Sequence, residues 1–292
     1  MKTPAYMVTG LLWSMLTLNP LSAGGNPNYH RPMWSPRGDH LVFMSDKDGN
    51  WELYLLRMKD LRVKRLTHDP AFDGYATWSP KGDQLVYGSD GNLILLALGS
   101  GKTFNLSKEN GKPEGKSDFS ADWSPDGQHI VFASDRSGDR DLYTMAPNGT
   151  GCRLLFSHKG SDGDPVFSPD GKHIAFTSQR NDHFSLALIE GDGSGYEVLV
   201  TDQGRMYGPA WSPDGKALVY NSLSGEKDLY LIRLGDNLPR RLTHHPGLDH
   251  LAVFMPGGKE IMFTREDGDQ ERIYTLELSS LRTKVFPHPH AW

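Results

Sequence analysis

The sequence predicts an all-β fold, a six-bladed β-propeller of four-stranded antiparallel blades preceded by a signal peptide. Three observations lead to this prediction. A short motif, complete as Trp-Ser-Pro-Asp-Gly at residues 123–127, recurs six times at intervals of 43 to 45 residues. Each interval contains four short runs of strand-forming residues. The chain also has 32 Gly and 19 Pro, which supply many turns. Four strands in a unit of this length are typical of a propeller blade.

An aromatic residue opens each motif, and we call these six residues the anchors. The anchors are Trp34, Trp78, Trp123, Phe167, Trp211 and Phe254. A blade cannot bury both of its faces alone, so large side chains must fill the space between neighbouring blades. We therefore interpret the anchors as wedges between blades rather than as residues that stack on a ligand.

The first repeat shows the order of elements within a blade. A short strand ends at Trp34, and the Ser-Pro-Arg-Gly sequence that follows forms a turn, because Pro fixes φ and Gly accepts a positive φ. Further strands are expected at 41–44, 52–56 and 63–67. Blades start near residues 31, 75, 120, 164, 208 and 251, within one domain spanning 24–292. Each blade is contiguous, so we expect no blade that combines the two ends of the chain.

Residues 1–23 have the features of a signal peptide. Lys2 is the only charged residue before Arg31, residues 8–18 are mostly apolar, and Ala23 ends a small-residue cleavage site. A membrane anchor would instead need about 20 apolar residues. We therefore expect cleavage near Ala23 and a periplasmic or secreted, monomeric product without a membrane span.

Composition and motifs exclude several classes of protein. The net charge is −5 and the basic residues are scattered, which does not fit a nucleic-acid-binding protein. Cys152 is the single cysteine, so neither an intramolecular disulfide nor a cysteine zinc site can form. The run at 99–103 lacks the first glycine of a phosphate-binding loop, and no Gly-x-Ser-x-Gly nucleophile motif exists.

The repeated motifs resemble those of TolB-type propellers. Trp-Ser-Pro-Asp-Gly, Ser-Asp-Arg-Ser-Gly, Asp-Leu-Tyr and Arg-Leu-Thr follow in this order over about residues 28–286. The resemblance implies a non-enzymatic scaffold that binds a protein or peptide, with an envelope lipoprotein as the partner in a Tol–Pal-like role. It also implies a propeller-only relative, because TolB has an α/β domain before its propeller and about 30 residues stand there here. The same repeat occurs in peptidases and pectin lyases, so it indicates fold more than function.

The loops that lead into each first strand are the expected binding site, because they line the mouth of the central channel. An aspartate stands five residues before the anchor in blades 2, 3, 4 and 6. The predicted partner-binding residues are Tyr29, Asp73, Asp118, Asp162, Met206, Tyr207, Asp249 and His250. Carboxylates around one opening suit a basic peptide. The alternative is that each aspartate caps its own turn.

Acidic residues and histidines in these channel-mouth loops form two candidate metal sites. Oxygen ligands suit calcium, and the candidate ligands are Asp118, Asp162 and Asp164. A second, less favoured group combines Asp249 with His244, His245 and His250. Histidines directly after the fourth strand also occur at 68 and 158, which favours a repeated structural feature over a metal site. We expect no other cofactor.

Two further features leave alternatives open. A carbohydrate-active or metal-assisted lyase or hydrolase would use Asp162, Asp249 and His250, although the sequence does not show a full set of acid, base and metal. Blade 2 also carries five extra residues within 107–117. Such an insertion marks either a working face or a tolerated polar loop.

Overall fold

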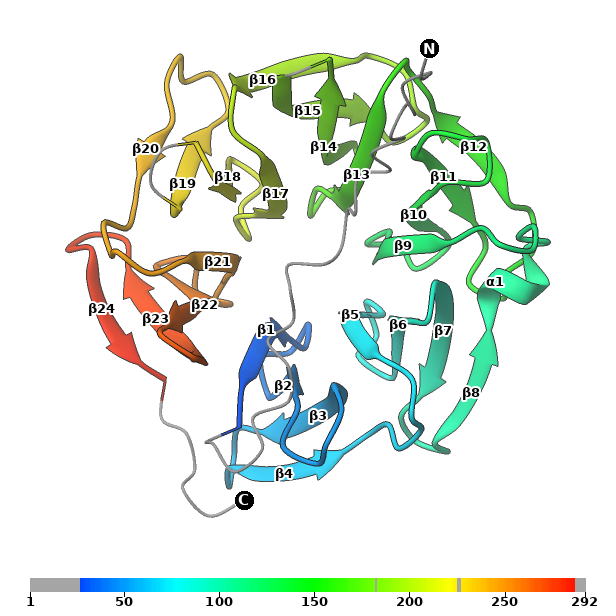
Figure 1. Ribbon diagram of the computed structural model, residues 1–292, viewed down its shortest axis with the longest axis horizontal. Coiled ribbons are helices and arrows are strands. Elements are labelled where there is room, and N and C mark those ends of the chain that lie inside the picture. The colour runs from blue at the N-terminus through cyan, green and yellow to red at the C-terminus, as the bar shows by residue number, and fades with distance from the viewer. Residues whose placement is uncertain (1–26, 182, 225–226, 287–292) are drawn as a thin grey trace, which may run out of the picture.

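The chain forms a ring of six four-stranded antiparallel sheets, each made of four consecutive strands (Figure 1). This computed structural model describes residues 27–181, 183–224 and 227–286, so the predicted signal peptide lies outside the described residues. The six-bladed propeller predicted from the repeats is confirmed. In the part of the chain that the structure describes, no helix is long and apolar enough to span a bilayer.

The strand bounds follow the repeat closely. Blades 1 to 3 contain β1 (Tyr29–Trp34), β2 (His40–Ser45), β3 (Glu52–Arg57), β4 (Arg62–Arg65), β5 (Asp73–Trp78), β6 (Gln84–Ser89), β7 (Asn92–Ala97), β8 (Lys102–Asn105), helix α1 (Leu106–Glu109), β9 (Asp118–Trp123), β10 (Ile130–Ser134), β11 (Asp141–Met145) and β12 (Arg153–Phe156). Blades 4 to 6 contain β13 (Ser161–Phe167), β14 (His173–Arg180), β15 (His183–Glu190), β16 (Glu197–Asp202), β17 (Met206–Trp211), β18 (Ala217–Ser222), β19 (Asp228–Arg233), β20 (Arg240–Arg241), β21 (Asp249–Phe254), β22 (Glu260–Asp267), β23 (Gln270–Glu277) and β24 (Arg282–Val285). In blade 1 the expected strands are confirmed within two residues at each end.

The anchors lie between blades, as predicted. Trp78 and Trp123 are 7% and 6% exposed. The indole Nε1 of Trp78 donates to the carbonyl of Met33 in the preceding blade at 3.1 Å, and Trp211 makes the same bond to Val166 at 3.2 Å. A Trp at the end of an inner strand therefore both fills the gap and ties two blades together.

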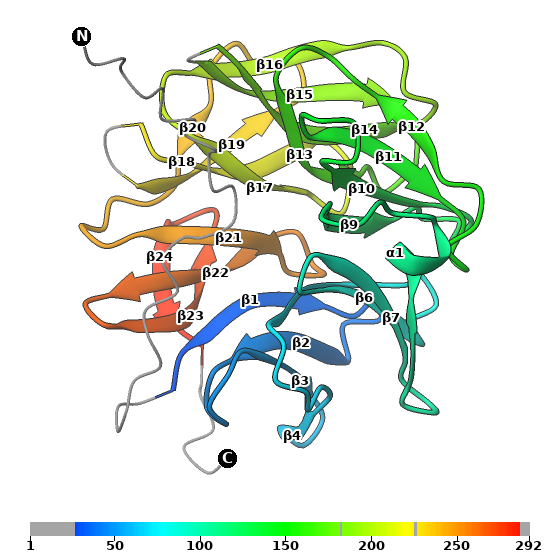
Figure 2. The same cartoon turned by 45° about the vertical axis from the view of Figure 1, so that its right-hand side comes forward.

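The ring closes by packing of the first blade against the last, without a shared sheet. Strand β1 packs against β21, β22 and β23 (Figure 2). The side chain of Asn28 accepts from the backbone N–H of Glu271 at 3.0 Å, and that of Thr264 accepts from the N–H of Arg31 at 3.1 Å. Apolar side chains of both blades also share one core cluster.

Every inner strand contains a bulge at the same place. In each blade the register between the first and second strands shifts at one point. The shift lies between the residue four positions before the anchor and the residue immediately before the anchor. The third residue before the anchor has φ between 44° and 61° in all six blades. These bulge residues are Arg31, Tyr75, Ser120, Asp164, Gly208 and Leu251. A left-handed φ costs a residue other than Gly about 1 kcal/mol or more, so the bulge is imposed by the fold and re-aims one side chain per blade.

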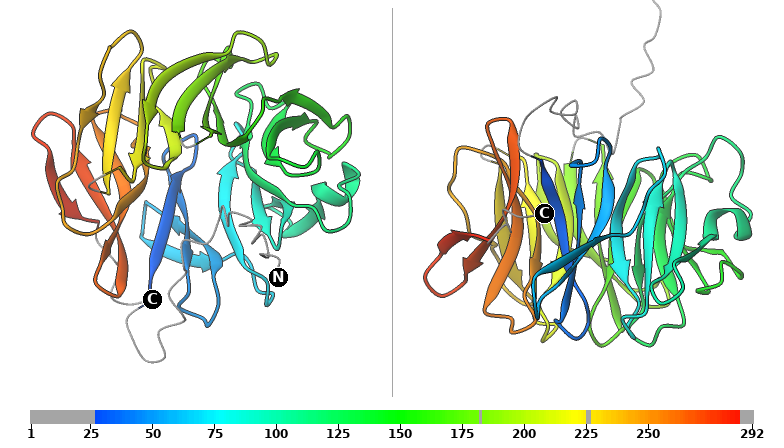
Figure 3. Two further views of the ribbon diagram at one scale, coloured as in Figure 1. Left: turned by 45° about the horizontal axis from the view of Figure 1, so that its top comes forward. Right: turned by 90° about the horizontal axis from the view of Figure 1, so that it is seen from below.

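The inner strands run from one face of the disc to the other, as the side view in Figure 3 shows. Their first residues lie at the face that carries the loops from the preceding blade. The hairpins between the second and third strands lie at the same face. This arrangement collects two loops per blade around one end of the channel.

Candidate functional site

A cavity of about 320 Å³ lies on the axis of the ring, and residues from all six blades line it. Five of the six bulge residues are among them: Arg31, Tyr75, Ser120, Asp164 and Leu251. The bulge therefore turns these side chains toward the channel. The cavity opens at the face where loops lead into the inner strands, which is the face that the sequence indicated.

Three arginines surround the cavity, and each lies over an aromatic ring. The guanidinium carbon of Arg31 is 4.5 Å from the ring centroid of Tyr75. Arg140, in the hairpin before β11, is 4.1 Å from the ring of Phe119. Arg205, just before β17, is 5.6 Å from the ring of Tyr207. Such cation–π contacts hold the three guanidinium groups in place beside the cavity.

Arg140 remains charged at neutral pH. Burial lowers the pKa of Arg140 to about 10, although the Asp164 carboxylate opposes this shift. The two Asp164 oxygens accept hydrogen bonds from the Ser120 hydroxyl at 2.9 Å and from the Gly208 N–H at 3.3 Å. The cavity lining therefore combines three guanidinium groups with Asp90, Asp118 and Asp164, whereas an acidic mouth was expected from the sequence.

The four aspartates that stand five residues before an anchor lie inside their own blades. They are at most 1% exposed: Asp73, Asp118, Asp162 and Asp249. Three of them form ion pairs with an arginine of the second strand or of the hairpin that follows it. Arg136 pairs with Asp118 at 2.8 Å, and Arg180 pairs with Asp162 at 2.8 Å. Arg265 binds both oxygens of Asp249, at 2.5 and 2.7 Å. These carboxylates hold the start of each inner strand to its own blade.

Asp73 differs from the other three because it has no such arginine. Blade 2 has a two-residue Asp90-Gly91 hairpin in place of the longer hairpin that supplies Arg136 in blade 3. Burial raises the pKa of Asp73 to about 6, with the charge of Asp69 adding to the effect. Asp73 is therefore a buried carboxyl group whose ionisation opposes folding.

The remaining predicted residues have separate surroundings. Tyr207 and Asp118 are among the residues that line the cavity. Met206 is fully buried. Tyr29 is half-buried, with its ring 6.0 Å from the ring of Phe43. His250 is fully buried. The structure thus places two of the eight predicted partner-binding residues at the cavity.

The blade 2 insertion forms helix α1 and a turn at the outer edge of the ring (Figure 1). The Ser107 hydroxyl donates to Asp118 Oδ2 at 2.7 Å, and the Asn110 amide donates to the same oxygen at 3.2 Å. Both oxygens of Asp118 are therefore bonded. The insertion completes the hydrogen bonding of a buried ion pair and does not enter the cavity.

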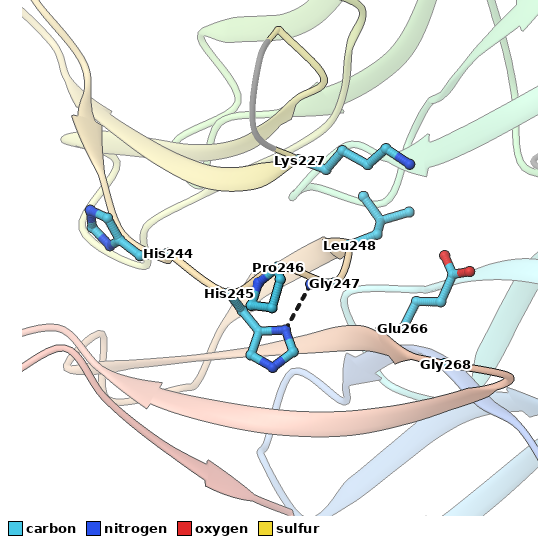
Figure 4. A pocket seen from close by; sticks show the side chains of 8 residues that line it. All are labelled: Lys227, His244, His245, Pro246, Gly247, Leu248, Glu266 and Gly268. Carbon is cyan, nitrogen blue, oxygen red and sulfur yellow. Dashed lines mark hydrogen bonds between the residues drawn. The ribbon is translucent and has the colours of Figure 1, made fainter.

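The histidines of blade 6 do not gather in one place. His244 and His245 line a hollow of about 510 Å³ between blades 5 and 6, and their rings lie apart in Figure 4. His245 Nδ1 accepts from the Gly247 N–H at 3.0 Å. Among the described residues, one group of three ligand-type side chains comes within ligating distance, and it joins His250 to His30 and Glu271. The calcium set therefore has no geometric support in the described chain and stays a prediction.

Comparison with known protein families agrees with the fold. Residues 94–195 and 189–286 match the model of the TolB beta propeller domain. The chain belongs to the TolB beta-propeller family. Residues 35–139 also match the model of the dipeptidyl peptidase IV N-terminal region. No curated protein sequence matches the chain.

Solved structures show that the TolB-type fold serves more than one role. A TolB-type protein from Agrobacterium tumefaciens is 21% identical, with a TM-score of 0.69 over 79% of this chain and 86% of that one. TolB from Acinetobacter baumannii is 16% identical, with a TM-score of 0.69 over 88% of this chain and 62% of that one. An oligogalacturonate lyase solved in complex with manganese is 20% identical, with a TM-score of 0.65 over 91% of this chain and 80% of that one. At these identities the likeness concerns the fold alone.

Proposed function

We propose that this TolB-family propeller is an exported, non-enzymatic binding protein that takes an acidic segment of a partner protein into its central cavity. The observation that supports this function is the set of three arginines, Arg31, Arg140 and Arg205, each over an aromatic ring at the mouth. A guanidinium group is planar and can bind a carboxylate through two parallel hydrogen bonds. The neighbouring rings can cover the apolar parts of the same peptide.

The cavity is better suited to binding than to proton transfer. A general acid or base works best when its pKa lies near the operating pH, and the pKa of Arg140, about 10, is well above it. Three carboxylates line the cavity in the described chain. Asp118 is in a buried ion pair, Asp164 accepts from two donors, and Asp90 accepts from the Phe72 N–H at 3.4 Å. Export to the periplasm is part of the proposal and rests on the apolar run at 8–18 and Ala23.

The experiment is a selection of random peptides displayed on phage against the mature chain, followed by fluorescence anisotropy with the enriched peptides. Enriched sequences should be rich in Asp and Glu. Arg140→Gln should weaken their binding at least tenfold, since it removes a charge-assisted contact. Arg233→Gln is the matched control, because Arg233 is exposed at the end of β19 on the outer part of blade 5.

Other outcomes would contradict the proposal. Enrichment of Lys-rich peptides would support binding of a basic peptide instead. If Arg140→Gln bound the selected acidic peptides with unchanged affinity, Arg140 would not contribute to binding. The same guanidinium groups could also bind the carboxylates of an acidic polysaccharide. Turnover of polygalacturonate by the mature chain, followed by ultraviolet absorbance of unsaturated products, would favour the lyase alternative.

A further inference from the structure

Two histidines and a glutamate meet where the first and last blades close the ring. His30 lies on β1, His250 on β21 and Glu271 on β23. The imidazole rings are 5.0 Å apart between centroids. Nε2 of His30 is 3.8 Å from one Glu271 oxygen, and Nε2 of His250 is 4.0 Å from the other. One ligand atom from each side chain can be chosen so that all three lie within 4.8 Å of one another.

The two histidines are buried, Glu271 is partly buried, and several polar atoms of the group lack hydrogen-bond partners. His30 is 4% exposed and His250 is fully buried. Among the described residues, no partner lies within hydrogen-bond distance of Nδ1 of His30, either ring nitrogen of His250 or Oε2 of Glu271. A buried polar atom without a partner is destabilising, so these unpartnered atoms on three side chains that face one another need an explanation. An ion between them is the simplest one.

The histidines are not part of the repeat. Both stand four residues before an anchor, where blades 2 to 5 have Gly74, Phe119, Gly163 and Tyr207. They occur in the first blade and the last blade, which are distant in sequence and adjacent in space. The pairing is therefore specific to the closure of the ring.

We propose that His30, His250 and Glu271 bind a first-row divalent metal ion, with zinc as the reference ion, and that this ion ties the first blade to the last. Two imidazoles and one carboxylate form a ligand set that zinc uses with a fourth position left for water. Tetrahedral zinc with bonds of about 2.0–2.1 Å places its ligand atoms ~3.3 Å apart. Since the three ligand atoms lie within 4.8 Å of one another, a pair of them would have to approach by up to about 1.5 Å to reach this spacing.

Charged groups of both signs lie near this site. The carboxylates of Glu266 and Asp46 are close enough to act on Glu271, and the guanidinium group of Arg31 is close enough to act on His30. The bond from the Glu271 N–H to Asn28 fixes the start of β23 beside the chain that leads into β1.

The consequence is a metal-dependent closure of the ring. The two blades share no sheet, so their contact depends on side-chain packing and a few hydrogen bonds. A ligand that binds the folded chain alone raises the ratio of folded to unfolded protein about 100-fold when its free concentration is 100 times Kd. Zinc should therefore stabilise the closed ring, independently of whether the cavity binds a partner.

The test uses the full mature chain without an affinity tag, stripped with a chelator and then titrated with zinc alone. Isothermal titration should give one bound ion per chain, and thermal unfolding should shift upward with zinc. Calcium and magnesium should have no such effect, because those ions prefer oxygen ligands. Cobalt in place of zinc should give the visible d–d absorption of a low-symmetry site, a readout that needs no variant.

Two variants and a control separate a metal site from a merely structural role. Glu271→Gln keeps the shape of the side chain, and His30→Gln removes one imidazole; each should weaken zinc binding at least 100-fold. His173→Gln, at a partly exposed position in blade 4, should bind zinc as the natural chain does. The proposal is overturned if the natural chain binds no zinc and shows no cobalt spectrum, or if Glu271→Gln retains the full response to zinc.

Discussion

Replacing Arg265 with leucine should lower the free energy of unfolding by about 3–5 kcal/mol, the usual cost of leaving one member of a buried ion pair unpaired. The guanidinium group binds both Asp249 oxygens, at 2.5 and 2.7 Å. Asp249 is fully buried and Arg265 is 7% exposed. In Arg265→Leu the carboxylate stays buried without its partner. Arg265 also lies 4.7 Å from the ring centroid of Tyr274, a contact that leucine replaces only in part.

Urea unfolding followed by tryptophan fluorescence measures this change from the midpoint and slope of the transition. The matched control is Arg282→Leu on the exposed strand β24, which should change stability by less than about 0.5 kcal/mol. The double variant that combines Arg265→Leu with Asp249→Asn should recover part of the loss, because it removes the buried charge. A loss below about 1 kcal/mol for Arg265→Leu, or no recovery in the double variant, would refute a structural role for this aspartate.

Two further predictions concern single buried groups. Burial raises the pKa of Asp73 to about 6, so its contribution to stability is present below about pH 4 and is lost as the pH rises through 6. Asp73→Asn should therefore be about 2–3 kcal/mol more stable than the natural chain at pH 8 and nearly equal to it at pH 4, by urea unfolding; a difference independent of pH would contradict this. Trp78→Phe should cost about 1 kcal/mol more than Trp123→Phe in thermal unfolding, because Trp78 Nε1 donates to Met33 whereas Trp123 Nε1 has no partner; equal costs would contradict this.

The blades were predictable because each repeat encodes its own strands and turns. The glycine that ends each motif turn has φ between 68° and 72°, as the turn chemistry requires. The anchors also gave a correct count of units. These features depend on residues close together in the sequence, so the repeat contains them in full. That partners bind at the cavity face stays a prediction.

The residues of the cavity were less predictable, and the repeat explains why. Aspartate recurs five residues before the anchors because it has the same structural partner in several blades. The position three residues before the anchors differs in every blade, and that position faces the channel. Arg and Leu do not favour a left-handed φ, so the sequence does not predict the bulge at Arg31 or Leu251. The bulge instead comes from packing six inner strands around one axis. The positions that repeat from blade to blade therefore predict the fold, whereas the bulge position, which differs in every blade, supplies residues to the candidate site.

Arg140, Arg205 and the pair of His30 with His250 depend on contacts between loops and between the chain ends. Arg140 and Arg205 lie outside the inner strands, where the spacing from an anchor does not place a side chain. The two histidines meet only once the ring has closed. Both histidines stand four residues before an anchor. Comparing this position in blade 1 and blade 6, on the expectation that these two blades pack together, would have identified the pair from the sequence.

The most direct test of the proposed function maps where an acidic peptide binds. A photoreactive p-benzoylphenylalanine at Leu251, which faces the cavity, should crosslink to a selected acidic peptide under light. The same group at Leu238, which is 80% exposed on the outer part of blade 5, should not. Mass spectrometry identifies the adduct. Crosslinking at 251 that is lost in Arg140→Gln is the predicted result, and crosslinking at 238 alone, or at neither position despite measurable binding, would place the binding site outside the central cavity.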